Sequence, residues 1–263
     1  MAEVLKSVRR IVVKVGYSIL VENQVIASHR IEELCAFLAD LQSAYEVILV
    51  TSGAIAAGYT KKEMDKSLEP NKQALASMGQ PLLMHMYYTE FQKHGVLCAQ
   101  MLLGAREMAS CKGAVADDNA IEALLTHKVV PIINEHDAIS PRELLFGDNN
   151  RLSAHIAYHF KADLLVILSD IDGYYTANPR TCADAKTRLV VHEINPDDLV
   201  ADATPNNRFA TGGIVTKLQA AQFLLKGGKM YLSSGFRLEK ARDFLGGHHH
   251  TGTLFLPPAL TSS

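Results

Sequence analysis

The amino-acid sequence predicts an α/β fold built on a mainly parallel sheet that helices cover on both faces. Two observations carry this prediction: several strand-length runs are entirely apolar, and longer segments with helical spacing separate them. An entirely apolar strand is one that is buried on both faces of its sheet, and parallel strands need crossover connections that are usually helices. A third observation agrees, since polar or glycine-rich motifs follow several of the apolar runs directly.

The expected elements alternate along the chain. The expected strands cover residues 11–15, 47–51, 96–102, 129–133, 164–168, 230–233 and 253–255. The first long helix starts with Ser28 as its cap and buries one face at helical spacing, formed by Ile31, Leu34, Cys35, Leu38 and Leu41. Further helices are expected at about 81–94, with Pro81 in the first turn, and at 114–126, 149–160 and 214–225.

Composition and charge restrict the class of protein. The net charge of −2 argues against a nucleic-acid-binding protein. The four cysteines form no CxxC pair, which favours separate thiols over a disulfide framework or a zinc site. Lys14 interrupts the first apolar run too early for an export signal, and no run reaches the roughly 18 apolar residues of a membrane span. We expect a soluble cytoplasmic protein with one domain over residues 1–256 and a short tail over 257–263.

Two motifs lie at the carboxyl ends of the first two predicted strands, at the sheet edge where ligands of open parallel sheets bind. Lys14 and Gly16 would place an ammonium group and a close backbone approach beside an anion, although a lysine on an edge strand facing solvent is the simpler interpretation of this motif alone. Residues 51–58 (TSGAIAAG) would expose backbone N–H groups to an anionic ligand. The alternative for this glycine motif is a tight turn with close packing of helix on sheet.

Acidic side chains follow two later strands. Glu135 and Asp137 would bind an ammonium group or a metal, or form a solvated loop. Asp170 and Asp172 also lie at a strand end, and Tyr174 and Tyr175 either flank a nucleotide base or pack within their loop.

Two further motifs lie at the starts of helices. Gly147, Asp148 and Asn149 read as a turn that caps the following helix, with positioning of lysines by Asp148 as the alternative. Residues 210–217 (ATGGIVTK) suggest phosphate contacts at a helix N-terminus, or a flexible loop and a solvated lysine. The sequence contains no GxxxxGK[ST] motif, and no GxGxxG motif follows the first strand.

The order of these motifs carries more information than any single motif. VVKVG, VTSGAIAAG, VVPIINEHDA, FGDNNRLSA, SDIDGYYTANPR and TGGIVTKLQAA together resemble glutamate 5-kinases of the amino-acid kinase superfamily over about residues 10–255. This resemblance implies a three-layer α/β/α sandwich with a mainly parallel central sheet. It also implies ATP-dependent phosphorylation of the γ-carboxylate of L-glutamate, the first step of proline biosynthesis.

The resemblance assigns roles residue by residue. Lys14 and Lys217 match lysines that hold the transferred phosphoryl group, and Asp148 matches the aspartate that orients them. Ser52, Asp137 and Asn149 match glutamate-binding positions, and we expect Asp137 to pair with the α-ammonium group. The ATP-binding positions are Lys14, Ser169, Asp170, Thr211, Gly212, Gly213, Ile214, Val215, Thr216 and Lys217. No protein metal site is expected, because Mg²⁺ would arrive with ATP.

The resemblance also implies partners. It suggests a homo-oligomer, either a dimer or a tetramer, and a glutamyl phosphate reductase as the recipient of the product, with no nucleic acid and no membrane as partners. The chain reads as a short form without the C-terminal PUA domain that many members carry. Asn150 stands where the family usually has an aspartate. An acetylglutamate or uridylate kinase and a catalytically inactive binding protein on the same fold are the alternatives.

Overall fold

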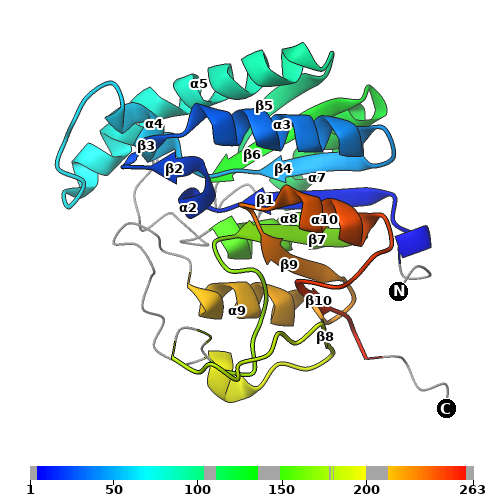
Figure 1. Ribbon diagram of the computed structural model, residues 1–263. Coiled ribbons are helices and arrows are strands. Elements are labelled where there is room, and N and C mark those ends of the chain that lie inside the picture. Colours follow the sequence, from blue (N-terminus) through cyan, green and yellow to red (C-terminus); the bar gives the residue numbers. More distant parts are fainter. Residues whose placement is uncertain are drawn as a thin grey trace. The chain divides into compact units, whose positions relative to one another are not determined.

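The computed structural model of the protein describes residues 5–103, 111–135, 149–177, 179, 181–199 and 213–258. The chain forms two compact units, one of residues 17–149 and one of residues 1–16 with 150–263 (Figure 1). The expectation of one domain over residues 1–256 with a tail over 257–263 stays a prediction. Within the described ranges, none of the helices has the length and apolar character required to cross a membrane.

The 17–149 unit contains a parallel sheet with the strand order β5-β6-β4. Its elements are α2 (Tyr17–Leu20), β2 (Val21–Glu22), β3 (Val25–Ile26), α3 (Ser28–Gln42), β4 (Glu46–Val50), α4 (Ala54–Tyr59), α5 (Glu69–Lys93), β5 (Leu97–Leu103), α7 (Cys111–Thr126) and β6 (Val129–Glu135). Helix α5 packs against α4, α3 and β5, and α7 packs against β6. The parallel pairing brings the carboxyl ends of β4 and β6 to the same edge.

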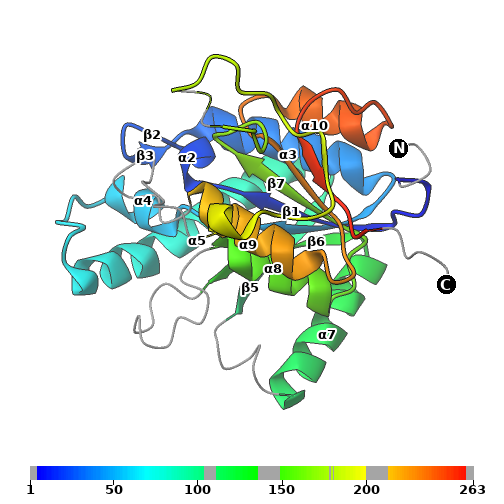
Figure 2. The same ribbon diagram turned by 90° about the horizontal axis from the view of Figure 1, so that it is seen from below.

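The other unit contains strands in the order β1-β7-β9-β10-β8. Its elements are β1 (Arg10–Val15), α8 (Asn149–His159), β7 (Leu164–Ser169), β8 (Val190–Val191), the 3₁₀ helix η2 (Pro196–Leu199), α9 (Ile214–Leu224), β9 (Met230–Ser234), α10 (Leu238–Leu245) and β10 (Thr253–Phe255). Strands β1, β7 and β9 are parallel, and β10 runs antiparallel to β9. Figure 2 shows α8 beside α9, where the rings of His155 and Phe223 stack 4.2 Å apart.

The mainly parallel α/β fold predicted from the sequence is confirmed. Every expected strand is present with its ends shifted by at most two residues, and every residue of β1 and β7 is buried, as entirely apolar runs require. The expected apolar face of α3 is buried as well. The hairpin of β2 and β3 and the short helices α2, α4 and α10 were not expected, because segments this short carry too few periods of a hydrophobic pattern.

Two predicted helix starts were wrong. Ala27 is the N-cap of α3 and makes no side-chain cap bond, while Ser28 is already helical. The carbonyl of Ala27 accepts the first helical hydrogen bonds, from the amides of Arg30 at 3.0 Å and Ile31 at 3.4 Å, which moves the start back by one residue.

Pro81 lies inside α5 rather than in its first turn, and the proline near the N-terminus of α5 is Pro70. A proline in a helix interior removes one hydrogen bond and is costly. Packing compensates, because one face of α5 is buried on both sides of the proline by Leu75, Ala76, Gly79, Leu83, Tyr87 and Phe91.

Candidate functional site

In the 17–149 unit, neutral polar side chains gather at the carboxyl ends of β4 and β6. The side-chain amide of Asn149 donates to the Thr51 carbonyl at 2.8 Å and to the Ser52 hydroxyl at 2.7 Å. The same nitrogen lies 3.3 Å from the Oδ1 atom of Asn134, a residue of β6 that is 1% exposed. The structure therefore brings together Ser52 and Asn149, two of the three residues predicted to bind glutamate.

Gln80 of α5 completes this amide cluster of Ser52, Gln80, Asn134 and Asn149. Asn134 Nδ2 donates to Gln80 Oε1 at 3.0 Å. Among the described residues, Asn149 Oδ1 and Gln80 Nε2 are buried without a hydrogen-bond partner. Most buried polar atoms have a partner, so one unused acceptor and one unused donor in a single cluster indicate a ligand that supplies both.

Thr51 anchors the amide cluster to the core. Its backbone amide donates to the Ile133 carbonyl at 2.9 Å, which joins the ends of β4 and β6. Its hydroxyl lies 2.7 Å from the hydroxyl of Tyr87, and neither residue is exposed to solvent. Burial raises the pKa of Tyr87 above its ordinary range, so this phenol stays protonated. Thr51 has a structural role here and holds the backbone that Asn149 contacts.

The glycines after β4 serve conformation and close packing. Gly53 has φ = 108°, a left-handed conformation that favours glycine, and it directly precedes α4. A Cβ atom on Gly58 would lie 2.0 Å from the Leu75 carbonyl oxygen, and one on Gly79 would lie 1.8 Å from the Ala54 carbonyl oxygen. Gly58 and Gly79 therefore let α4 and α5 approach closely. For Gly58, the packing interpretation of the TSGAIAAG motif holds, with a helix as the partner instead of the sheet.

In the other unit, Lys14 lies near the carboxyl end of β1, a strand that is buried along its whole length. It is only 6% exposed, so the interpretation as a solvent-facing lysine is wrong. Gly16, just beyond the end of β1, donates its amide to the Leu168 carbonyl of β7 at 3.2 Å. Because a buried ammonium group is costly without negative charge nearby, the position of Lys14 suits a residue that meets an anion.

The start of α9 contributes a second buried cation. Lys217 is 4% exposed, and its Nζ atom donates to the Gly213 carbonyl at 3.3 Å. Gly213 is the N-cap of α9 and makes no side-chain cap hydrogen bond. The first backbone N–H groups of the helix, those of Ile214 and Val215, are therefore not capped by a side chain of the N-cap residue. Helix N-termini of this kind favour phosphate.

Asn150 links α8 to the start of α9. Its amide donates to the Thr216 hydroxyl at 2.9 Å, and that hydroxyl donates in turn to the Gly213 carbonyl at 3.2 Å. Asn150 is 2% exposed. The residue that departs from the family pattern is thus part of the contact that fixes the first turn of α9.

Ser169 and Asp170 lie at the carboxyl end of β7, where the ATP-binding residues were expected. The Ser169 hydroxyl donates to Asp170 Oδ1 at 3.0 Å and accepts from the Ile171 amide at 3.3 Å. The Ser169 carbonyl accepts from the Gly235 amide of the β9–α10 loop at 2.8 Å. These bonds set the course of the chain as it leaves β7.

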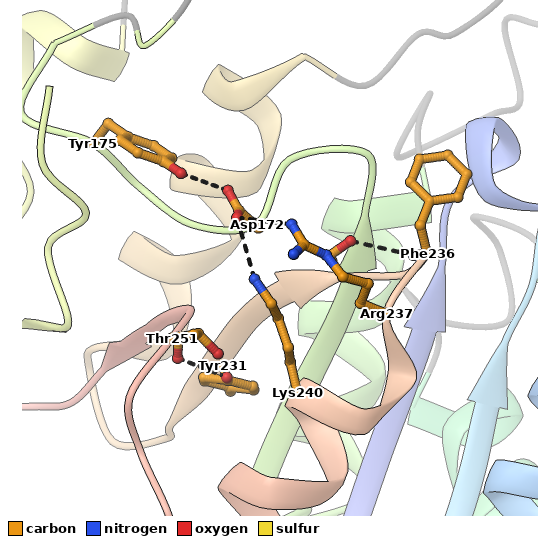
Figure 3. A network of polar contacts seen from close by, with 8 residues as sticks. Asp172, Tyr175, Tyr231, Phe236, Arg237, Lys240 and Thr251 are labelled. Atoms are coloured by element: carbon orange, nitrogen blue, oxygen red, sulfur yellow. Dashed lines mark hydrogen bonds and ion pairs between the residues drawn. The ribbon is translucent and has the colours of Figure 1, made fainter. Parts of the chain in front are cut away.

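In the SDIDGYYTANPR motif, the side chains of Asp172, Tyr174 and Tyr175 after Asp170 make structural contacts, and those of Asp172 and Tyr175 are shown in Figure 3. Asp172 accepts from the Tyr175 hydroxyl at 2.6 Å and lies 3.4 Å from Lys240 Nζ and 3.7 Å from Arg237. Burial opposes ionisation of Asp172 most strongly, but the hydrogen bond from Tyr175 and the charge of Lys240 hold the pKa of this carboxyl below its usual range. Tyr174 is 6% exposed, stacks on Phe255 and donates to Asp198. The packing interpretation is therefore correct for Tyr174, and Tyr175 is held by Asp172.

Four of the predicted site residues lie outside the described residues: Asp137, Asp148, Thr211 and Gly212. Their assigned roles stay predictions. In the part of the chain that the structure describes, no group of three or more His, Cys, Asp or Glu side chains could hold a metal ion.

The sequence analysis missed Gln80 as a site residue and did not single out Asn134. Gln80 lies inside a long helix, far along the chain from the strand ends, and no local motif marks it. Asn134 interrupts an apolar strand within the VVPIINEHDA motif, and a buried amide at that position was the available signal.

A mainly parallel α/β fold with buried lysines and a helix N-terminus suited to phosphate has the features of an enzyme that handles phosphoryl groups. The chain belongs to the amino acid kinase family, whose model matches residues 9–233.

Close relatives cover nearly the whole chain. A glutamate 5-kinase of Leishmania donovani is 76% identical over 97% of this chain and 98% of its own length. A glutamate 5-kinase of Wolinella succinogenes is 55% identical over 94% of this chain and 98% of its own length. One of Carboxydothermus hydrogenoformans is 41% identical over 98% of this chain, which spans 70% of that longer protein.

Solved structures share the fold at low sequence identity. The T. acidophilum isopentenyl phosphate kinase product complex matches 94% of this chain and 99% of its own with a TM-score of 0.64 at 15% identity. Carbamate kinase from Giardia lamblia bound to AMP-PNP matches 96% of this chain and 99% of its own with a TM-score of 0.66 at 13% identity. The amino-acid kinase fold expected from the sequence is thereby confirmed.

Proposed function

We propose that this chain catalyses the ATP-dependent phosphorylation of the γ-carboxylate of L-glutamate, which gives γ-glutamyl phosphate in the first step of proline biosynthesis. The observation that carries the proposal is 76% identity to a glutamate 5-kinase over nearly the full length of both chains. Identity at this level leaves little room for a different acceptor.

The amide cluster supports an amino acid as the acceptor substrate. The unused acceptor, Asn149 Oδ1, suits an ammonium group, and the unused donor, Gln80 Nε2, suits a carboxylate. An α-amino acid carries both groups. Hydrogen bonds to charged partners contribute about 1.5–3 kcal/mol each, so two of them are sufficient to select such a ligand.

The chemistry requires no general base. The γ-carboxyl group has an ordinary pKa near ~4.3 and is ionised at neutral pH. The obstacle is the approach of one anion to another, and catalysis consists of neutralising charge and aligning the reacting oxygens. Lys14 and Lys217 would hold phosphoryl oxygens, and the N-terminus of α9 would contribute its backbone N–H groups. Asp148 would orient the lysines.

ATP would reach these residues as its magnesium complex. Mg²⁺ would be held largely by phosphate oxygens and water. When bound, Mg²⁺ neutralises charge on the phosphates.

The proposal also covers the fate of the product, the compartment and the oligomeric state of the enzyme. The product is a reactive acyl phosphate, and a glutamyl phosphate reductase that receives it would limit its hydrolysis. We further propose a cytoplasmic enzyme that forms a dimer or tetramer, following the family resemblance.

Production of ADP tests the proposed function. Purified protein, Mg²⁺ and ATP are combined with L-glutamate, N-acetylglutamate, carbamate or UMP in parallel. ADP should form rapidly with L-glutamate and at background rates with the other acceptors. If ADP formed only at the background rate with L-glutamate but rapidly with another acceptor, the chain would have a different activity within its family.

A further inference from the structure

The segments that follow β7 and β9 leave the sheet at the same edge, next to residues expected to bind ATP. Ser169 of β7 is the register partner of Ser234 of β9, and the two strands are parallel. The next residue, Gly235, donates its amide to the Ser169 carbonyl at 2.8 Å. The course of the chain at Ser169 and Asp170 therefore depends on what joins these two segments beyond the sheet.

The Asp172 carboxylate makes a second connection between the two segments. Its Oδ1 atom accepts from the Tyr175 hydroxyl at 2.6 Å, and its Oδ2 atom lies 3.4 Å from Lys240 Nζ and 3.7 Å from Arg237 Nη2. Figure 3 shows this carboxylate between the hydroxyl of Tyr175 and the ammonium group of Lys240. Both carboxylate oxygens are thus used, and the two cations belong to the start of α10, directly after the segment that follows β9.

The charge at the start of α10 explains why a carboxylate is favoured at position 172. Arg237 is the N-cap of α10 and makes no side-chain cap hydrogen bond, and Lys240 lies in the first turn of the helix. Cations are unfavourable at a helix N-terminus, which is the positive end of the helix dipole, and anions are favourable there. The side chains of Lys240 and Asp172 are 16% and 32% exposed, so water screens this ion pair only in part. Asp172 therefore offsets the positive charge and holds the start of α10 against the segment after β7.

We infer that Asp172 is a positioning residue for the nucleotide, which acts through the backbone of Ser169 and Asp170; the inference rests on the proposed use of ATP. The ion pairs fix the segment after β7 before ATP binds, so ATP does not have to order this segment when it arrives. Ordering a loop on binding opposes affinity. Loss of the carboxylate should therefore weaken nucleotide binding and leave the acceptor site and the phosphoryl transfer step unchanged.

The test compares wild type with Asp172→Asn, Lys240→Met and the double variant, and Glu239→Gln is the matched control. Asparagine preserves the size of the side chain and an oxygen that can accept from Tyr175, but it removes the charge. Glu239 is an exposed carboxylate in the same first turn of α10.

Three measurements separate positioning of the nucleotide from a contribution to folding. Calorimetry gives the affinity of each protein for ATP in the absence of an acceptor. Steady-state kinetics give the KM for ATP, the KM for glutamate and kcat. Urea denaturation gives the free energy of unfolding, which is all that a purely structural ion pair would change.

Asp172→Asn should weaken ATP binding and raise the KM for ATP about fivefold, while kcat and the KM for glutamate stay within about twofold. Lys240→Met should have a smaller effect of the same kind because Arg237 remains, and it provides the same test if Asp172→Asn does not fold. The double variant should bind ATP no more weakly than Asp172→Asn alone, since both substitutions remove one interaction. Glu239→Gln should behave as wild type.

Unchanged ATP affinity in Asp172→Asn and in Lys240→Met would overturn the inference, whatever the change in the free energy of unfolding. Additive losses of ATP affinity in the double variant would overturn it as well, because the two residues would then act independently. The affinities are measured without an acceptor, so they decide the role of Asp172 even if glutamate proves not to be the substrate.

Discussion

The two units of the chain supply polar groups of different kinds. The amide cluster of the 17–149 unit consists of neutral side chains that hold one another by hydrogen bonds of 2.7–3.3 Å. The unit of residues 1–16 and 150–263 instead buries two lysine side chains, Lys14 and Lys217. Under the proposed function, we expect the first region to select its ligand by the geometry of donors and acceptors, and the second by charge.

Removal of a charge should have the largest effect on the reaction. We predict that Lys217→Ala lowers kcat on the order of 10²-fold or more and leaves the KM for glutamate within a few-fold, because one preorganised cation at the transferred phosphoryl group is lost. Lys226→Ala, an exposed lysine just beyond the other end of α9, is the control and should retain wild-type kcat. Near-normal turnover of Lys217→Ala would contradict the role given to the charged region.

Removal of a neutral hydrogen-bond donor from the amide cluster should affect only the binding of the substrate glutamate. We predict that Gln80→Ala raises the KM for glutamate on the order of tenfold, because one hydrogen bond to a charged group is lost, and leaves the KM for ATP unchanged. Gln42→Ala, which removes an amide that donates to the Lys128 carbonyl in the same unit, should leave both constants unchanged. If the KM for ATP rose as much as that for glutamate, the division between the regions would be wrong.

The support beneath the amide cluster should matter for stability alone. Tyr87→Phe removes the buried partner of the Thr51 hydroxyl, which retains its contact with the Ser52 carbonyl at 3.2 Å. We predict a loss of about 1 kcal/mol in the free energy of unfolding, measured by urea denaturation, with kinetic constants close to wild type. A marked change in the KM for glutamate with unchanged stability would instead place Tyr87 within the substrate site.

The same comparison separates what the sequence could predict from what it could not. The apolar strands predicted the fold, and the paired glycines before residue 214 predicted a helix start that carries Thr216 and Lys217. Ser52 and Asn149 were grouped by the family resemblance, and the structure brings them together. Gln80 reaches the amide cluster from α5 through tertiary packing, which no sequence motif records.

Local signals also misled where packing decides the outcome. Pro81 resembled a helix start, but the apolar face of α5 continues through it. Lys14 alone resembled a solvent-facing lysine, but its strand is buried along its whole length. Tyr174 and Tyr175 were candidate partners for a base, and the structure uses Tyr174 for packing and Tyr175 for a hydrogen bond to Asp172.

The most direct test of the account is a competition between two acceptors. Equal concentrations of L-glutamate and N-acetylglutamate are incubated with the protein, Mg²⁺ and ATP, hydroxylamine traps the acyl phosphates, and mass spectrometry quantifies the two hydroxamates. A site that pairs with a free ammonium group should give γ-glutamyl hydroxamate almost alone, since the acetylated substrate lacks that charge and leaves a buried polar group unsatisfied. Comparable amounts of the two products, or an excess of the acetylated one, would contradict the proposed function.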